Sequence, residues 1–131
     1  MKEITELMIN KYKLQNIDFM GYKFTRNNAS YHHLIIPKRL GGKEIIENGA
    51  ILNRNTSHPY LHIIEQIDKD AFYFITSEMI DMNIKRYIDL DNLRRIDDIL
   101  CEFEEHHKDD TTSKGKILIR KEFKTRAIRQ L

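Results

Sequence analysis

The sequence has little cysteine, proline and glycine: one Cys, two Pro and five Gly in 131 residues, with no Trp. The lone Cys101 can neither close a disulfide within the chain nor build a cysteine zinc site, so any bound metal must be held by histidine, asparagine or carboxylate side chains. No apolar run approaches the roughly 18 residues of a membrane helix, and charged residues are spread through the start of the chain. We therefore expect a cytoplasmic protein with no membrane partner.

The composition is typical of one globular domain spanning residues 1–131. Hydrophobic residues make up 40% of the chain and charged residues 32%. A chain of this length buries one modest core and has little room for a second domain. Within this domain we expect a central structural unit at about residues 20–85, an acidic helix at about 91–108 and a basic tail at 114–131.

The net charge of +2 hides two oppositely charged segments. Residues 89–110 hold nine acids and three bases, whereas residues 114–131 hold seven bases and one acid. A basic tail is a common footprint of polyanion binding, so the second segment is a candidate for phosphate contacts. The alternative is that the two segments pair with each other, and the sequence leaves both interpretations open.

The spacing of apolar residues predicts a mixture of helices and strands, and so an α+β fold. The expected helices cover residues 3–14, 57–85 and 91–107, and the expected extended segments cover residues 20–24, 31–36, 49–52 and 117–119. Gly21 indicates a bend in the first extended segment. Ser57 is a good N-cap for the long helix, in which a break is expected near residues 68–70.

Four of the six histidines lie between residues 32 and 62. His58 and His62 are four residues apart, so on a helix both rings project from one face, as a two-ligand metal platform requires. His32 and His33 are neighbours on an expected strand, where alternation lets one bind an ion while the other addresses a substrate. Taken singly, each histidine is more typical of a solvated helix face or a strand end. The interpretation therefore depends on the whole set.

The order of these residues resembles the HNH endonucleases, whose site is a ββα-metal unit made of a hairpin and a helix. The resemblance covers about a quarter of the chain, and it implies that three histidines hold one divalent metal ion: His32, His58 and His62. It also implies that His33 is the general base that deprotonates water. Asn48 is implied as a second catalytic residue, which pins the loop between the strands so that a backbone carbonyl can hold the His33 tautomer.

The resemblance implies phosphodiester hydrolysis in DNA, with RNA as a second candidate substrate. Three neutral imidazoles suit Zn²⁺ or Ni²⁺ better than Mn²⁺ or Mg²⁺, although Mg²⁺ can operate by its abundance in cells. The candidates for phosphate contacts are Lys38, Arg39, Lys43 and Arg54. A single site cuts one strand, so a double-strand break requires a homodimer or two nicking events.

The chain departs from many members of that family in lacking the paired CxxC motifs that bind a structural zinc. Asn53 and the pair Thr56-Ser57 stand where such cysteines would fall. The stretch from Asn53 to Glu65 resembles a cysteine-free branch of small bacterial and mobile-element proteins, in which membership does not guarantee activity. The alternative function is a catalytically idle module on the HNH scaffold that binds nucleic acid or a protein partner, such as a mobile-element regulator or an inhibitor of a defence system.

Overall fold

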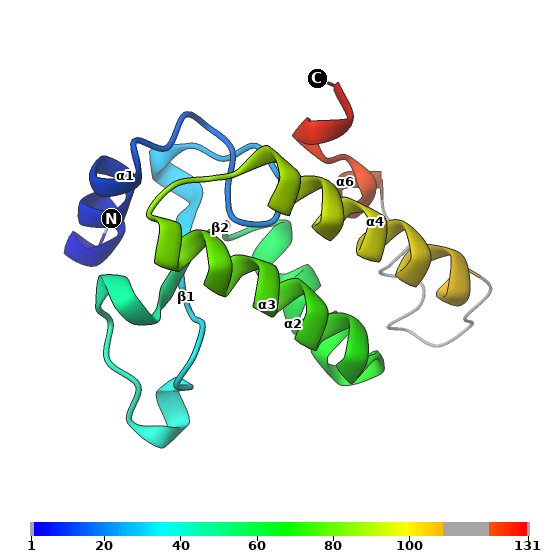
Figure 1. Cartoon of the computed structure of the whole chain (residues 1–131), viewed down its shortest axis with the longest axis horizontal. Coiled ribbons are helices and arrows are strands. Elements are labelled where there is room, and N and C mark those ends of the chain that lie inside the picture. The colour runs from blue at the N-terminus through cyan, green and yellow to red at the C-terminus, as the bar shows by residue number, and fades with distance from the viewer. Residues whose placement is uncertain (1, 109–120, 131) are drawn as a thin grey trace.

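The computed structural model describes residues 2–108 and 121–130 (Figure 1). Its helices and strands, in chain order, are α1 (Glu3–Tyr12), β1 (Ala29–His33), β2 (Gly49–Asn53), α2 (Ser57–Ile67), α3 (Lys69–Lys85), α4 (Leu90–His107) and α6 (Lys121–Lys124). Short 3-10 turns cover Arg26–Asn28, Lys38–Leu40, Ile46–Asn48 and Ala127–Gln130. One antiparallel hairpin lies among helices, with α2 packed on it directly after β2. The predicted α+β class is confirmed.

Every residue of β2 is buried, because α1, α2 and α3 all pack on this strand. Burial on both faces explains the uninterrupted apolar run at residues 50–52. The antiparallel register places His33 opposite Gly49 at the end of the hairpin where the two strands are connected. A Cβ at Gly49 would lie 2.2 Å from the ring of Tyr31, so the close packing of the two strands requires glycine there.

The first strand is shifted from the predicted range of 31–36, since it begins at Ala29 and ends at His33. The N–H of Leu34 still donates to the backbone carbonyl of Asn48, at 2.7 Å, but the strand pairing goes no further because the side chain of Asn48 takes the two donors that follow. Its Oδ1 accepts hydrogen bonds from the backbone N–H groups of Ile35 and Ile36, at 3.0 and 2.7 Å. Residues 34–36 therefore belong to the connection between the strands.

The extended segment predicted over residues 20–24 is instead a tight loop, although the bend expected at Gly21 is present, with φ of 89°. Strand pairing within this segment is limited to one isolated bridge. Asp18 is completely buried, and its Oδ1 accepts hydrogen bonds from the backbone N–H groups of Met20 and Tyr22, at 2.9 and 3.0 Å. The strand prediction was wrong because a buried carboxylate, and not a neighbouring strand, accepts these hydrogen bonds.

The Asp18 carboxylate also reaches the hairpin and α2. Its Oδ2 accepts hydrogen bonds from the backbone N–H of Asn53, at 2.8 Å, and from the hydroxyl of Ser57. The predicted N-cap is wrong by one residue: Thr56 is the N-cap, and Ser57 is the first residue of α2. Asp18 thus ties the preceding loop, the end of β2 and the start of α2 together.

The helix predicted over residues 57–85 is two helices, with the boundary at the expected break. Asp68 has an extended backbone, and its side chain accepts a hydrogen bond from the N–H of Ala71, which makes it the N-cap of α3. Both helices bury one face in the core, through Tyr60, Leu61, Ile64, Ile75, Met79 and Met82. Among the helices that the structure describes, none is both long and apolar enough to cross a membrane.

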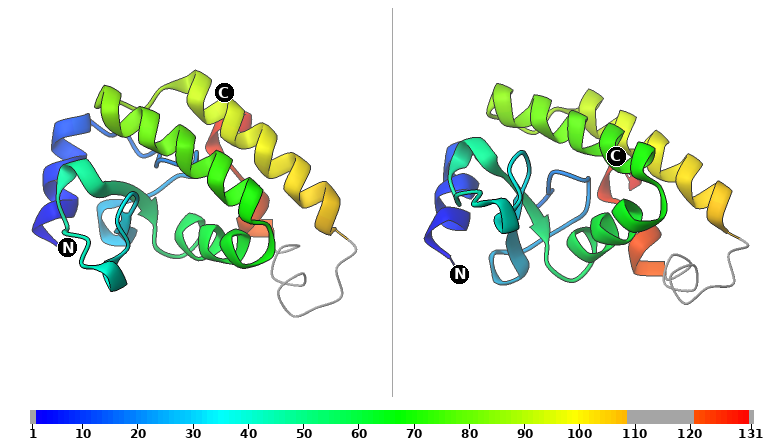
Figure 2. Two further views of the ribbon diagram at one scale, coloured as in Figure 1. Left: turned by 60° about the horizontal axis from the view of Figure 1, so that its bottom comes forward. Right: turned by 90° about the horizontal axis from the view of Figure 1, so that it is seen from below.

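The helices α3 and α4 lie side by side, and the C-terminal residues pack on α4 (Figure 2). The side chain of Arg126 is fully buried, and it pairs with Asp97 and with both carboxylate oxygens of Glu104, at 2.8 and 3.2 Å. The acidic helix and the basic tail therefore pair at this residue, so Arg126 is not available for the phosphate contacts suggested for the tail. The extended run predicted at 117–119 lies outside the described residues.

Candidate metal centre

Three histidines from two elements come together on one side of the hairpin. His32 comes from β1, and His58 and His62 come from the first half of α2. One ring nitrogen of each lies within 4.8 Å of the others, and His32 Nδ1 is 3.4 Å from His58 Nε2. The ring centroids are 5.0 to 5.5 Å apart. Three imidazole nitrogens at this spacing can hold one metal ion with only small side-chain movements.

Local structure explains why these rings meet. Side chains alternate along β1, so Ser30 and His32 project toward the same helix, α2. His58 and His62 are one turn apart on α2 and share the face of the helix that is turned toward β1. Tyr60 and Ile64, on the opposite face of that helix, are completely buried and hold it against the core. The packing of α2 therefore directs both histidines toward the strand.

Burial keeps two of the three rings neutral. The pKa of His32 is lowered to about 3, mainly because the ring is removed from water and also because His58, His62 and His33 are close. Burial and the charges of His62 and His33 lower the pKa of His58 to about 4. Neutral imidazole is the form that binds metal, so at neutral pH these ligands need not release a proton first. The side chain of His62 is 50% exposed, which leaves the cluster open to solvent.

Two further side chains contact the ring nitrogens that a metal ion would leave free. Ser30 Oγ lies 2.7 Å from His58 Nδ1, and Glu65 Oε1 lies 3.4 Å from His62 Nδ1. Such contacts fix the tautomer and the orientation of metal-binding histidines. Neither Ser30 nor Glu65 was identified from the sequence. The signal was nevertheless present, since Ser30 precedes His32 by two residues on the strand and Glu65 follows His62 by three on the helix.

His33 lies beside the cluster, but on the other side of β1. Its half-buried ring packs edge-to-face against Tyr31, with the ring centroids 5.0 Å apart. A charge on His33 still contributes to the lowered pKa values of His32 and His58, so the ring is electrostatically coupled to the cluster. Within the described residues, no backbone carbonyl holds the His33 ring as the resemblance implied. Its role as a general base remains a prediction.

Asn48 is buried and contacts both arms of the connection between the strands. Its Oδ1 accepts the two hydrogen bonds from Ile35 and Ile36 that end β1, while its Nδ2 donates to the carbonyls of Ile36 and Lys43, at 3.0 and 3.2 Å. The amide therefore closes the loop at its base. Asn48 acts on the loop and not on the histidine rings, and its part in catalysis remains a prediction.

The four candidates for phosphate contacts lie in two places. Lys38, Arg39 and Lys43 are exposed on the connection that follows β1. Arg54 follows β2 at the opposite end of the hairpin, and its Nη2 donates a hydrogen bond to the carbonyl of Asn27, at 3.0 Å. The structure thus groups the first three cations and separates Arg54 from them.

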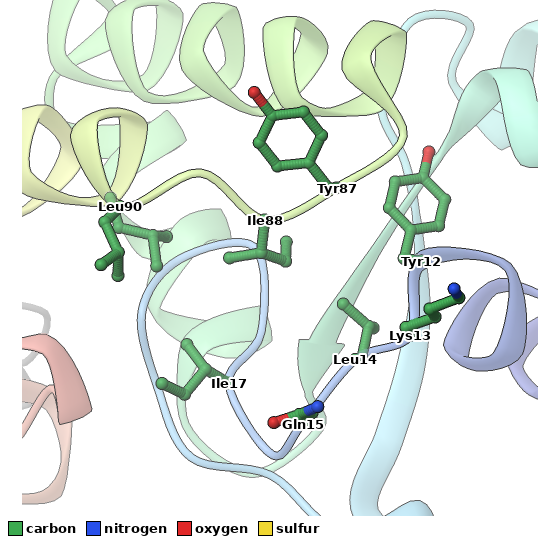
Figure 3. Close-up of a pocket in the computed structure, with 9 residues that line it drawn as sticks. Tyr12, Lys13, Leu14, Gln15, Ile17, Tyr87, Ile88 and Leu90 are labelled. Atoms are coloured by element: carbon green, nitrogen blue, oxygen red, sulfur yellow. The ribbon is translucent and has the colours of Figure 1, made fainter.

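A separate pocket of about 250 Å³ lies between the end of α1 and the connection from α3 to α4 (Figure 3). Apolar side chains from both sides form most of its wall, with Leu14 and Ile17 across from Ile88 and Leu90. Among the described residues, no histidine, cysteine or carboxylate lines this pocket, so they offer it neither metal ligands nor a nucleophile of those types. The histidine cluster is therefore the stronger candidate for a functional site.

No family model matches the chain, and no curated protein or solved structure matches it either. The fold and the site by themselves define an α+β protein in which a hairpin and the following helix bring together three histidines that could hold a metal ion. The resemblance to HNH endonucleases remains an interpretation of the order of His32, His33, Asn48, His58 and His62.

Proposed function

We propose that the chain is a metal-dependent endonuclease of the HNH type that hydrolyses phosphodiester bonds in DNA. The observation that carries this proposal is the convergence of three histidine nitrogens within 4.8 Å at the strand that also bears His33. The same strand leads into a loop with three exposed cations. A possible metal site, a base candidate and candidates for phosphate contacts thus lie within one hairpin and one helix.

In this proposal the residues divide the work of hydrolysis. His33 takes the proton from the attacking water, as a neutral imidazole can do. His32, His58 and His62 would hold a divalent ion, which supplies Lewis-acid stabilisation of the charge that develops on the phosphate and the leaving oxygen. Lys38 and other loop cations attract the phosphate backbone. The half-exposed side chain of His62 keeps the cluster accessible from solvent, as phosphate binding requires.

The chemistry of the donors favours a borderline ion. Three neutral imidazoles suit Zn²⁺ or Ni²⁺, while Mn²⁺ and Mg²⁺ prefer sites with more oxygen ligands. The oxygens nearest the cluster, those of Ser30 and Glu65, contact ring nitrogens. We therefore expect one tightly bound ion of the Zn²⁺ or Ni²⁺ type in the purified protein, with Mn²⁺ or Mg²⁺ as replacements at high concentration.

The position of the acidic helix supports a nucleic-acid partner. In the views of Figures 1 and 2, α4 and the connection between the strands lie on opposite sides of the molecule. Two acids of α4, Asp97 and Glu104, are also paired with Arg126, which offsets one of their two negative charges. DNA that approaches the loop would therefore not meet the acidic face of α4 directly.

Plasmid cleavage tests the proposal. Supercoiled plasmid is incubated with Mg²⁺, Mn²⁺, Ni²⁺ or Zn²⁺ and with the native protein, His33→Ala or His58→Ala, and metal content is measured on the same samples. We expect the native protein to nick the plasmid. His33→Ala should keep its metal but lose activity by about 10²- to 10⁴-fold. His58→Ala should lose both metal and cleavage, while the control His106→Ala, an exposed histidine near the end of α4, should cut normally.

The contrary results are equally clear. A folded, metal-loaded protein that cuts neither DNA nor RNA with any of these ions would overturn the nuclease and support the idle binding module. If cleavage is unchanged in His33→Ala, the chain is a nuclease whose base is another group. Linear product formed at once, without a nicked intermediate, would indicate that two copies act together.

A further inference from the structure

The loop over residues 34–43, called the cationic loop from here on, combines apolar and positively charged side chains at the surface. Its large exposed apolar side chains are Ile35 (55%), Ile36 (50%) and Leu40 (68%). Its exposed cations are Lys38, Arg39 and Lys43, and it contains no acid. The first acid after it, Glu44, is paired with Lys2 at 3.0 Å. The cationic loop is therefore a surface on which apolar groups and unneutralised positive charge lie together.

The cationic loop is fixed at its base. Besides the contacts of Asn48, the Tyr31 hydroxyl accepts a hydrogen bond from the N–H of Ile45 and donates to the carbonyl of the same residue, at 3.1 and 2.7 Å. The two arms also touch, because a Cβ at Gly42 would lie 1.9 Å from the carbonyl oxygen of Ile36. A loop held in this way loses little conformational entropy when it binds, so its exposed side chains are preorganised for a partner.

The cationic loop also projects from the rest of the molecule. Figure 1 shows the connection between β1 and β2 extending away from the helices, with the short turn Lys38–Leu40 at its far end. Leu40, the most exposed of its apolar residues, therefore lies in the same turn as two cations. The loop leaves β1 directly after His33, so it continues the strand that bears the candidate base and one candidate metal ligand.

We propose that the cationic loop is a wedge for duplex DNA, in which Leu40 inserts between base pairs from the minor groove while Lys38 and Arg39 contact the flanking phosphates. Apolar wedges flanked by cations are used by proteins that unstack and kink a duplex from this groove. Unstacking is easiest at pyrimidine–purine steps such as TA, and hardest in stiff A-tracts. The cationic loop therefore gives the protein a preference for deformable steps without any residue that reads a base edge.

This inference rests on the proposed function and deepens it by naming the substrate as duplex DNA at flexible steps. Apolar and basic side chains on a projecting loop would also suit an anionic lipid surface. The position of the loop favours DNA, since it continues the strand that carries the candidate base and one metal ligand. The lipid surface is therefore an outcome that the experiment must be able to report.

Binding to fluorescent duplexes tests the wedge separately from cleavage. The protein carries His33→Ala so that it does not cut, and 2-aminopurine, which brightens when it is unstacked, is placed beside a central TA step or within an A-tract. We expect brightening and several-fold tighter binding for the TA duplex alone. Leu40→Ser should abolish both effects. The control Ile84→Ser, an equally exposed apolar residue on α3, should change neither.

The cations are tested by their effect on salt dependence. Replacing both Lys38 and Arg39 by Gln should weaken binding to either duplex and lower the slope of log K against log salt by about 1.8, which is about 0.9 for each lost phosphate contact. Brightening that persists in Leu40→Ser, or equal binding to the two duplexes, would overturn the wedge. So would binding to phosphatidylserine vesicles without binding to DNA. If the native protein cuts plasmid but no duplex brightens, only the wedge proposal is refuted. If the TA duplex brightens but the native protein does not cut plasmid, only the nuclease proposal is refuted.

Discussion

The two ends of the hairpin are each held by one buried polar side chain, but these side chains differ in charge and in what lies beyond them. At the end next to α2, the Asp18 carboxylate is completely buried and accepts four hydrogen bonds. At the other end, the neutral amide of Asn48 closes the cationic loop. One end is thus enclosed in the core, whereas the other supports an exposed surface.

The chemistry of the two groups explains this division. A carboxylate only accepts hydrogen bonds, so Asp18 gathers donors from three segments: the loop after it, Asn53 and Ser57. An amide both donates and accepts, so Asn48 can satisfy N–H groups on one arm of a loop and carbonyls on the other. The carboxylate of Asp18 therefore suits a place where only donors meet, from a loop, the end of β2 and the start of α2. The amide of Asn48 suits the closure of a loop, where donors and acceptors meet.

Asp18 also explains how the hairpin and helix are held without a cysteine zinc site. Many HNH proteins join these parts through a structural metal, and this chain has only Cys101. Here a single carboxylate joins the end of β2 to the start of α2, one residue before His58. The position of that histidine thus depends directly on a buried hydrogen-bond junction.

Asp18→Ala should have the largest effect on stability. It removes the acceptor of the Met20 and Tyr22 N–H groups, and it leaves Asn53 and Ser57 only their bonds to each other, at 2.9 and 3.4 Å. Each group that stays unsatisfied in the core costs about 1–3 kcal/mol. We expect the free energy of unfolding in urea to fall by at least about 3 kcal/mol. The matched control Asp98→Ala removes an exposed acid on α4 and should stay within about 0.5 kcal/mol of the native protein. Equal effects of the two substitutions would show that Asp18 is not the junction.

Asn48→Ala should cost less, about 2 kcal/mol, because water can reach the groups that it releases at the edge of the loop. Its main effect should be local. Loss of the amide frees the base of the cationic loop, so we expect trypsin to cut faster after Lys38 and Arg39 while the rest of the chain stays folded. Asn27→Ala, at the opposite end of the hairpin, is the control. Unchanged cleavage by trypsin in Asn48→Ala would mean that the loop is held by other contacts.

The fold class and the histidine grouping could be predicted from the sequence because both follow from local periodicity. Helical spacing brings His58 and His62 to one face, and strand alternation sends His32 and His33 to opposite sides. The junction at Asp18 could not be predicted in this way. Its partners lie up to 39 residues away in the sequence, and no local pattern marks which acid will be buried.

The same limit applied to the details of the site. The end of β1 at His33 is set by Asn48, fifteen residues later in the chain, so alternation alone extended the strand too far. The displaced cap at α2 has the same origin, because Ser57 bonds to Asp18 and not to its own helix. The periodicity of apolar residues gives no information on long-range hydrogen bonds of buried polar groups, and these bonds set both boundaries.

The pH dependence of stability should have opposite signs at the two sides of the hairpin. Burial lowers the pKa of His32 to about 3, so between pH 6.5 and 3 the unfolded chain takes up a proton that the folded chain refuses, and stability falls as the pH falls. Burial raises the pKa of Asp18 to about 6, so between pH 6 and 4 the folded chain takes up a proton first, and stability rises as the pH falls.

Unfolding of metal-free protein in urea at several pH values measures both contributions. Compared with His32→Asn, the native protein should lose about 2 kcal/mol between pH 7 and pH 5. Compared with Asp18→Asn, it should gain about 1 kcal/mol between pH 6 and pH 5. If the free energy of unfolding of both variants follows the same pH dependence as that of the native protein, titration of His32 and Asp18 does not contribute to it.

The smallest effects should come from Ser30 and Glu65, the two side chains that contact the candidate metal ligands. They allow a second comparison, between a partly buried contact and an exposed one. Ser30 lies 2.7 Å from His58 Nδ1 in a partly buried position, whereas Glu65 lies 3.4 Å from His62 at the surface, where water can replace it. We expect Ser30→Ala to weaken Zn²⁺ binding about tenfold in a chelator competition, at the low end of the effects known for such partners. Glu65→Gln should weaken it about twofold, because an exposed contact is screened by solvent. Ser77→Ala, on α3 and away from the cluster, is the control. A larger loss in Glu65→Gln than in Ser30→Ala would mean that His62, and not His58, is the ligand whose orientation limits metal binding.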